Sequence, residues 1–343
     1  MNSQNTTQLV PILEMKSNIL TKSELAAYLH QPKSWLNAVV ITYTLIAYYG
    51  SLFLLLSSNG YLNAVGTLIL CHSLVYAALF SHELLHGTVF KKRRLNELTA
   101  AIIRWQTGMC YLPFRQIVRG HIAHHLGKNY QRKRLGTALL TLPKPLVSLI
   151  ITLEWFYFPV TSFLYLWRRN LSPFWTKQPF HKKFRVLAII LVRGTMFSFL
   201  GIASFKALCL YFLAYIMMIT IVRFNQAFEH TSGYIDDPES QRSFTTFSPL
   251  ISKRNSWLDI LVLNFGYHNA HHTLMFCPWY HLPTLDKHIF QGNDEHHLGW
   301  SELLGNYHRF RITRLFGDSG QTVDEQGNVN LEKFYGVQAA LPF

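Results

Sequence analysis

Four long apolar runs dominate the pattern of hydrophobic and polar positions along the chain. They cover residues 35–56, 61–80, 184–202 and 205–222, and the first two contain no Asp, Glu, Lys or Arg. A helix needs roughly 20 mostly apolar residues to cross a bilayer, so each run suits one crossing. Very short breaks separate the first run from the second and the third from the fourth. The pattern therefore predicts an all-α integral membrane fold with four transmembrane helices arranged as two hairpins.

Two further apolar segments differ from these runs because they contain charge. Residues 146–167 include Glu154 and Pro159, so we expect a helix that does not cross, either re-entrant or at the interface. Residues 95–112 include Arg104 and predict a helix at the interface or beneath the polar part of the protein. Histidine clusters precede and follow this region, and they can share one site only if the number of crossings between them is even.

Basic residues gather at one end of the predicted helices. The stretches 91–94 and 177–185 lie on the same predicted side, whereas the loops on the opposite side hold a single lysine. The positive-inside bias therefore predicts that this basic side is cytoplasmic. Arg193 lies inside the third run, where it either snorkels to the interface or faces protein.

The composition supports a multi-pass membrane protein. Of 343 residues, 49% are hydrophobic and 15% charged, against about a quarter charged in a soluble domain. The net charge of +14 lies beside the apolar runs, so we attribute it to anionic lipid headgroups rather than to nucleic acid. The four cysteines form no CxxC pair, which argues against a disulfide scaffold or a cysteine zinc site.

The ends of the chain are more polar than its middle. We predict a cytoplasmic or interfacial lead-in over residues 1–34, with an amphipathic helix over 9–30. Residues 35–316 form one membrane domain, and residues 317–343 form a polar tail.

Three histidine clusters stand at the predicted cytoplasmic ends of the apolar runs. They are His82-Glu-Leu-Leu-His86, His121-Ile-Ala-His124-His125 and His268-Asn-Ala-His271-His272. Side chains at i, i+3 and i+4 share a helix face, so each cluster is expected to aim its imidazoles in one direction, as metal ligands must. Composition alone predicts an HxxHH pattern roughly 0.04 times in such a chain, yet it occurs twice.

His230 is a further candidate ligand, because the fourth run returns it to the side of the clusters. Counting it gives nine histidines, enough for two metals with four or five ligands each. Imidazole binds iron as well as zinc, so the spacing leaves the metal open. The pair His296-His297 has no histidine three residues upstream and is interpreted as solvated surface.

The first cluster also matches HExxH, the motif of zinc metalloproteases in which the Glu is a general base. An intramembrane zinc protease would leave both HxxHH clusters without a role, so we favour a two-metal site over this interpretation. In the two-metal interpretation Glu83 either contacts a histidine ligand without touching the metal or is an acidic residue at the helix end.

With three clusters in this order and spacing, the chain resembles the membrane fatty acid desaturase superfamily. That superfamily includes carotenoid hydroxylases and ketolases, alkane hydroxylases and sphingolipid desaturases. The resemblance runs from about Tyr61 to Arg309, and the segments Asn264-Phe-Gly-Tyr-His-Asn-Ala-His-His and Pro278-Trp-Tyr-His-Leu-Pro resemble its third-box region. It implies four transmembrane helices and interfacial helices under a cytoplasmic, histidine-rich cap that holds two irons.

The resemblance also implies roles for individual residues. Gln226 stands where some members have an Asn that holds water near an iron, and Asn264 is a supporting residue of the third box. Ala270 stands where many members have Glu, so a hydrogen bond to an imidazole is either missing or supplied from elsewhere. The implied iron ligands are His82, His86, His121, His124, His125, His230, His268, His271 and His272.

The implied activity is O2-dependent oxidation of an unactivated C–H bond in a fatty acyl chain by two Fe2+ ions. Desaturation is the first expectation. Hydroxylation or ketolation of a hydrocarbon or carotenoid is the second, and oxidative decarboxylation of a fatty acid to a terminal alkene is the third. Outside the enzymes, the alternative is a membrane protein that stores or senses metal.

The expected partners are lipids and an electron donor. A ferredoxin or cytochrome-type donor is implied, because the sequence shows neither a flavin fingerprint nor a His-Pro-Gly-Gly haem motif. Arg115, Arg119, Lys128 and Arg132 flank the second cluster and are candidate carboxylate anchors, although contact with membrane headgroups is the favoured interpretation. We expect an integral membrane location, in the inner membrane if the source is bacterial.

Overall fold

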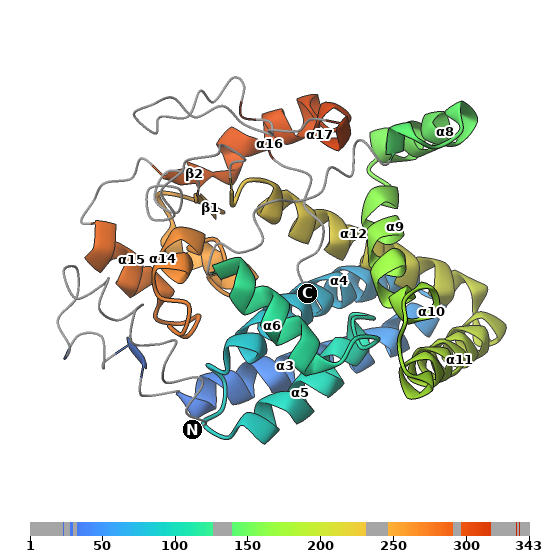
Figure 1. Cartoon of the computed structure of the whole chain (residues 1–343), viewed down its shortest axis with the longest axis horizontal. Coiled ribbons are helices and arrows are strands. Elements are labelled where there is room, and N and C mark those ends of the chain that lie inside the picture. Colours follow the sequence, from blue (N-terminus) through green and yellow to red (C-terminus); the bar gives the residue numbers. More distant parts are fainter. Residues whose placement is uncertain are drawn as a thin grey trace.

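The computed structural model is mostly helical (Figure 1). It describes residues 33–125, 139–230, 246–290 and 296–316, together with the single positions Ser23, Tyr28, Leu29, Phe334 and Gly336. Apart from those single positions, the predicted lead-in helix and polar tail lie outside the described residues, so the predicted domain limits stay predictions.

Four helices are long and apolar enough to cross a membrane. They are α3 (Ser34–Leu56), α4 (Gly60–His86), α11 (Phe180–Ala203) and α12 (Phe205–Ala227). Each contains one of the four predicted runs. The side chain of Asn59 accepts hydrogen bonds from the backbone at Tyr61 and Leu62, and Ser204 caps α12 in the same way through Ala207. These caps satisfy N–H groups that the first turn of a helix leaves unpaired, and so fix where α4 and α12 begin.

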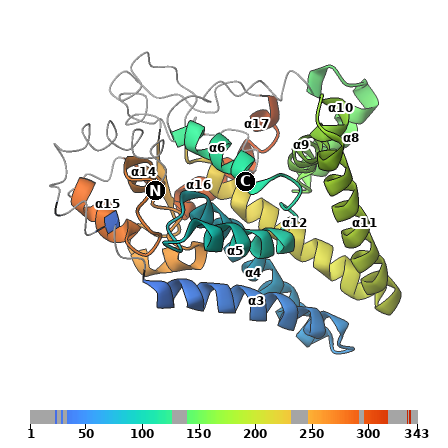
Figure 2. The same cartoon turned by 60° about the horizontal axis from the view of Figure 1, so that its bottom comes forward.

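The core lies where α4 packs between its neighbours. α3 and α12 both pack along α4, whereas α11 diverges from α12 beyond the Ser204 turn (Figure 2). Leu70, Leu74 and Phe80 of α4 are fully buried in this core, and Met218 of α12 packs into it as well. The arrangement as two hairpins within a membrane stays a prediction.

The segment predicted not to cross forms two helices with a sharp bend. α8 (Lys144–Trp155) and α9 (Val160–Asn170) meet at 115°, as in a re-entrant loop or a broken span. Pro159 lacks the N–H that a continuous helix needs, and Tyr157 has a left-handed φ of 61°. The bend thus arises at the residues that broke the apolar pattern.

The segment around Arg104 forms an amphipathic helix, α5 (Arg93–Gln106), that packs on α4. Its buried face includes Ala100 and Ile103, and Leu98 and Ile102 are exposed on the other side. Arg193 of α11 faces protein rather than solvent. Its guanidinium lies over the rings of Trp105 and Phe197, at 5.7 and 5.3 Å from their centroids, and donates to the Trp105 carbonyl.

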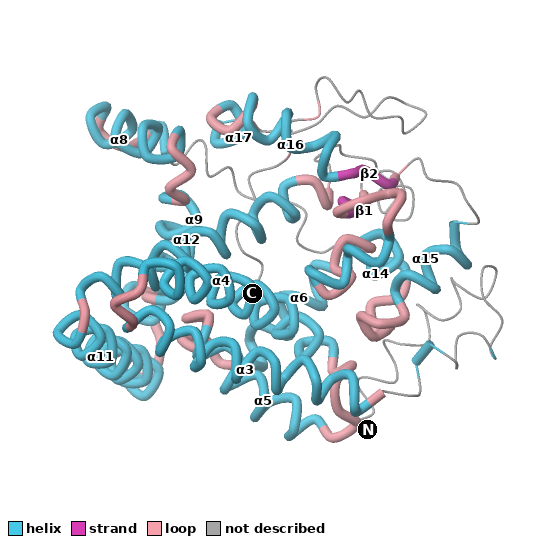
Figure 3. The backbone as a smooth tube through the Cα atoms, turned by 180° about the vertical axis from the view of Figure 1, so that it is seen from behind, coloured by secondary structure: helices cyan, strands magenta, loops and turns pink. Residues whose placement is uncertain are grey.

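The remaining described elements are α6 (Phe114–His125), α10 (Ser172–Trp175), β1 (Ser248–Leu250), η1 (Ser256–Val262), α14 (His268–Thr273), α15 (Leu282–Phe290), β2 (His297–Gly299), α16 (Trp300–Arg309) and α17 (Thr313–Phe316). α6 and η1 pack on α4, whereas α10 packs on α9 and α11. α14, α15, β1 and β2 lie together on the side of the molecule away from α11 (Figure 3). β1 and β2 pair in parallel, with Ser248 opposite His297. His297 is buried and its Nε2 lies 3.0 Å from Asp286 Oδ1, so the solvated-surface interpretation was wrong for this residue.

Candidate metal centre

The first histidine cluster occupies the last turn and a half of α4. His82 and His86 lie four residues apart on one face, and their Nε2 atoms are 3.3 Å apart. Gly87 ends the helix directly afterwards with a φ of 72°, a left-handed conformation that glycine adopts without a Cβ penalty. The local sequence therefore presents both imidazoles at a helix end.

Helix α6 brings the second cluster against the first. The Nε2 atom of His121 lies 2.8 Å from Nε2 of His86 and 3.1 Å from Nε2 of His125. From the short helix α14, the ring of His271 lies 4.6 Å from that of His82 and 4.7 Å from that of His86, measured between centroids. Imidazole rings from α4, α6 and α14, which are far apart in sequence, thus lie against one another.

The histidines form two adjacent groups. The five-histidine group has ligand atoms that all lie within 4.8 Å of one another and consists of His82, His86, His121, His125 and His271. The three-histidine group, defined in the same way, consists of His124, His230 and His272. His268 lies beside the second group, with its Nε2 3.0 Å from Nε2 of His230. All nine predicted histidines therefore gather at one place, where the two groups could each hold one ion.

The grouping differs from the expectation that each cluster points in one direction. His125 belongs to the five-histidine group and His124 to the other, and the same division separates His271 from His272. Successive residues of an α-helix are about 100° apart around its axis, so neighbouring side chains aim at different points. Adjacent histidines are therefore suited to two ions rather than to one.

The electrostatics of the centre suit metal binding. Burial, which is the largest cause, and the neighbouring imidazoles hold the pKa of four described rings well below that of a free histidine. These rings belong to His121, His125, His268 and His272. A neutral imidazole keeps a lone pair on one nitrogen, and this is the form that binds metals.

The donor set also passes a geometric test. Two nitrogens bound at about 2.1 Å to one ion at a right angle lie about 3 Å apart. The Nε2 separations along His82, His86, His121 and His125 are 3.3, 2.8 and 3.1 Å. Within the described chain, both ring nitrogens of His272 are buried without a hydrogen-bond partner. Such orphaned groups cost about 1–3 kcal/mol each, and a bound cation would satisfy one of the two. The residues present therefore fit metal ions.

Glu83 lies behind a histidine rather than among the converging nitrogens. Its Oε1 is 3.6 Å from Nδ1 of His82, and its Oε2 accepts hydrogen bonds from Thr88 Oγ1 at 2.8 Å and the Trp279 backbone at 3.1 Å. In a zinc protease the corresponding Glu must reach a metal-bound water. This placement does not favour the protease alternative.

Two other predicted supporting residues have different surroundings. Gln226, near the end of α12, is buried, and within the described residues neither atom of its amide has a partner. Asn264 has a left-handed φ of 54°, and its side chain donates to the Trp279 carbonyl at 3.2 Å. Asn264 therefore holds the segment after the third cluster in place.

One acidic residue near the centre escaped the sequence analysis. Glu229 is 5% exposed, and its Oε2 lies 3.6 Å from Nε2 of His268. Ala270, the position where an acid was expected, is fully buried and offers none. The position of Glu229, directly before the candidate ligand His230 and soon after an apolar run, was the sequence feature that could have predicted it.

The candidate anchors are placed only in part. Arg115 and Arg119 are exposed on α6, and Arg115 pairs with Glu97 at 3.3 Å. Lys128 and Arg132 lie outside the described residues.

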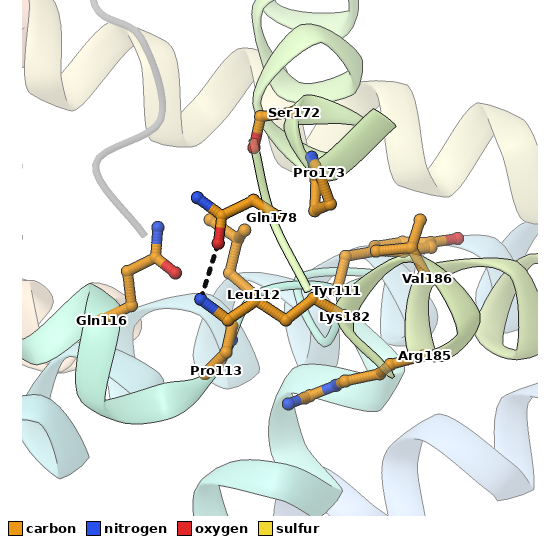
Figure 4. Close-up of a pocket in the computed structure, with 10 residues that line it drawn as sticks. All are labelled: Tyr111, Leu112, Pro113, Gln116, Ser172, Pro173, Gln178, Lys182, Arg185 and Val186. Carbon is orange, nitrogen blue, oxygen red and sulfur yellow. Dashed lines mark hydrogen bonds between the residues drawn. The ribbon is translucent and has the colours of Figure 1, made fainter. Parts of the chain in front are cut away.

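A pocket between the start of α6 and the start of α11 offers two other cations (Figure 4). Lys182 and Arg185 line it, with Gln116 and Gln178, and no acidic side chain is among the described residues that form its wall. Lys182 donates to Gln178 at 2.8 Å, and Arg185 donates to the Cys110 carbonyl at 3.0 Å. Such a pocket can hold an oxyanion.

Comparison with known proteins identifies a family. The family model described as Fatty acid desaturase matches residues 59–303. No curated protein matches the chain. The matched region includes the eight histidines of the two groups and His268, and it covers more than half of the sequence. The chain therefore belongs to the fatty acid desaturase family.

Proposed function

We propose that this protein is a membrane-bound di-iron oxidoreductase that uses O2 to introduce a double bond into a fatty acyl chain. The observation that carries the proposal is the gathering of histidines from α4, α6, α14 and the segment after α12 into two adjacent groups of five and three, with His268 beside the second. The family match supports the acyl substrate. Two bound irons would supply O2 activation and removal of hydrogen from an unactivated C–H bond.

The chain's own residues keep the centre ordered and dry. Phe265 packs edge-on against His82 with ring centroids 4.9 Å apart, and Phe276 lies 6.3 Å from His86. Glu83 lies against the His82 ring on the side away from the other nitrogens. These contacts hold the imidazoles in one geometry and limit access of water.

A polar head on the substrate is proposed to bind in the basic pocket. Gln116 of the pocket and His121 of the five-histidine group lie on the same helix, α6. Five residues of α-helix span about 7.5 Å, so a carboxylate or phosphate held by Lys182 and Arg185 would lie near the centre. The head would then fix which carbon of the chain can react.

We place the electron donor on the outer face of α6. Arg115 and Arg119 are exposed there, whereas His121 and His125 are buried on the other side of the same helix. A helix with its side chains is roughly 10 Å across, so a docked donor would be one helix away from the histidines. An acidic ferredoxin or a cytochrome-type protein on the cytoplasmic side fits this basic face.

Mass spectrometry of lipids and volatiles from a host that expresses the chain tests this function. We expect acyl chains with one additional double bond, and no such product from a His271→Ala variant. A His181→Ala variant, which changes an exposed histidine of α11, should keep the product. Hydroxylated chains or terminal alkenes would instead support the other predicted outcomes, and identical products from the His271→Ala variant would contradict the proposal.

A further inference from the structure

Two buried carboxylates lie beside the histidine groups, and they approach their histidines from opposite sides. Glu83 and Glu229 are 3% and 5% exposed. Glu83 faces Nδ1 of His82, at 3.6 Å, whereas Nε2 of that ring converges on His86. Glu83 therefore lies on the side of the imidazole that points away from the other ligand atoms.

Glu229 faces the converging side. Its Oε2 lies 3.6 Å from Nε2 of His268, and this same nitrogen lies 3.0 Å from Nε2 of His230. Its other oxygen, Oε1, accepts a hydrogen bond from Asn225 Nδ2 at 3.0 Å. One carboxylate oxygen is thus held by α12, and the other lies beside the nitrogen of His268 that faces His230.

The separation is compatible with two atoms bound to one ion and is long for a hydrogen bond. The same 3.6 Å separates Glu83 from His82, so the side of approach, and not the distance, distinguishes Glu229. Two donors bound at about 2.1 Å to a single ion can be at most about 4.2 Å apart. A good N–H···O bond brings the heavy atoms to about 2.9 Å, shorter than the observed 3.6 Å between His268 Nε2 and Glu229 Oε2.

We propose that Glu229 is a carboxylate ligand of the metal bound by the three-histidine group and His268. This inference rests on the proposed function, because it assigns one more donor to the same centre. The two metal positions would then differ, with imidazole alone around one ion and imidazole plus a carboxylate around the other. An anionic oxygen donor stabilises the more highly charged state of its ion, so the second ion is the more easily oxidised.

Glu229→Gln and Glu83→Gln variants of the full chain, purified with their bound metal, test the assignment. For wild type grown on 57Fe, we expect two distinct iron signals in the Mössbauer spectrum. Glu229→Gln should change one signal and lower retention of that iron against a chelator by at least the roughly 10–100-fold that loss of a partner behind a ligand costs. Glu83→Gln removes a carboxylate behind His82, so it should shift only the signal of the other ion, and by less, because Glu83 touches no ion. A Glu229→Asp variant should partly restore the changed signal.

The outcomes separate the ligand role from the proposed function. A Glu229→Gln protein with wild-type spectrum and wild-type retention would overturn the assignment. Equal spectral changes in both Gln variants would overturn it too, since that result would mean that Glu229, like Glu83, only positions a histidine ligand. If wild type holds a different metal, the same retention test on that metal decides the role of Glu229, and only the iron function fails. A wild-type protein that binds no metal overturns both.

Discussion

At the scale of single residues, burial decides how charged groups behave around the centre. Asp259 is fully buried, and its Oδ1 accepts from the Ile251 backbone at 3.0 Å. Burial raises the pKa of this carboxyl to about 6, from an ordinary value of 3.8. Its proton is therefore held more tightly in the folded protein than in the unfolded chain.

Asp259→Asn should stabilise the protein at neutral pH. Between the two pKa values the unfolded chain releases the proton first, so folding stability falls as the pH rises from 3.8 to about 6 and stays lower above it. Asn avoids this loss and can still accept from Ile251. We expect a gain on the order of 1–3 kcal/mol at pH 7.5 that shrinks below pH 6. Thermal unfolding across this pH range measures it, and a gain of equal size at pH 4 would refute the assigned cause.

Single residues also show what the sequence could predict. The convergence of histidines was predictable, because i, i+3 and i+4 spacing is a local property of helices. The division of His124 from His125 was also implied by helix geometry, but the identity of the two groups depends on which other elements approach. Glu229 and His297 were missed because their partners, His268 and Asp286, lie elsewhere in the sequence.

At the scale of elements, one buried ion pair joins the bent helices to the core. Glu154 of α8 accepts from Arg223 of α12 at 3.0 Å and from the backbone and hydroxyl of Thr161 in α9, at 2.8 and 2.6 Å. Both partners of the pair are buried. Unbroken apolar runs predicted the four long helices, because a helix that crosses lipid needs such a run. Glu154 and Pro159 interrupt the run at 146–167, and they marked this segment as different. The partner of Glu154 could not be predicted, because it lies on a helix distant in sequence.

Glu154→Ala should destabilise the protein strongly. It leaves the buried Arg223 without its partner, and breaking a buried pair from one side costs about 3–5 kcal/mol. A Lys253→Ala variant breaks the exposed Lys253–Glu302 pair and should cost under about 1 kcal/mol. Unfolding in detergent, followed by intrinsic fluorescence, compares the two. Equal losses in both variants would mean that the Glu154 pair does not hold α8 and α9 to α12.

At the scale of the whole molecule, the metal centre and the basic pocket share one end of the protein. α6 contributes to both, so the fold couples the place where a polar head can bind to the place where chemistry can occur. The bias of basic residues towards this end is the reason to propose that it is cytoplasmic.

Removing the two pocket cations should weaken substrate binding and loosen the choice of the reacting carbon. In a Lys182→Ala/Arg185→Ala variant we expect KM for an acyl substrate with an anionic head to rise about 10-fold or more, with double bonds at more than one position in the product. Lys183→Ala, a neighbouring cation outside the pocket wall, is the matched control. If KM stays at the wild-type value in the double variant, the head binds somewhere else.

The central claim is that the two histidine groups hold two irons. Metal analysis of purified, active protein tests it most directly, with a His121→Ala/His272→Ala variant that removes one histidine from each group. We expect about two iron ions per chain in the wild type and a large loss of iron in the variant. Active protein that contains zinc in place of iron, or no metal at all, would contradict it.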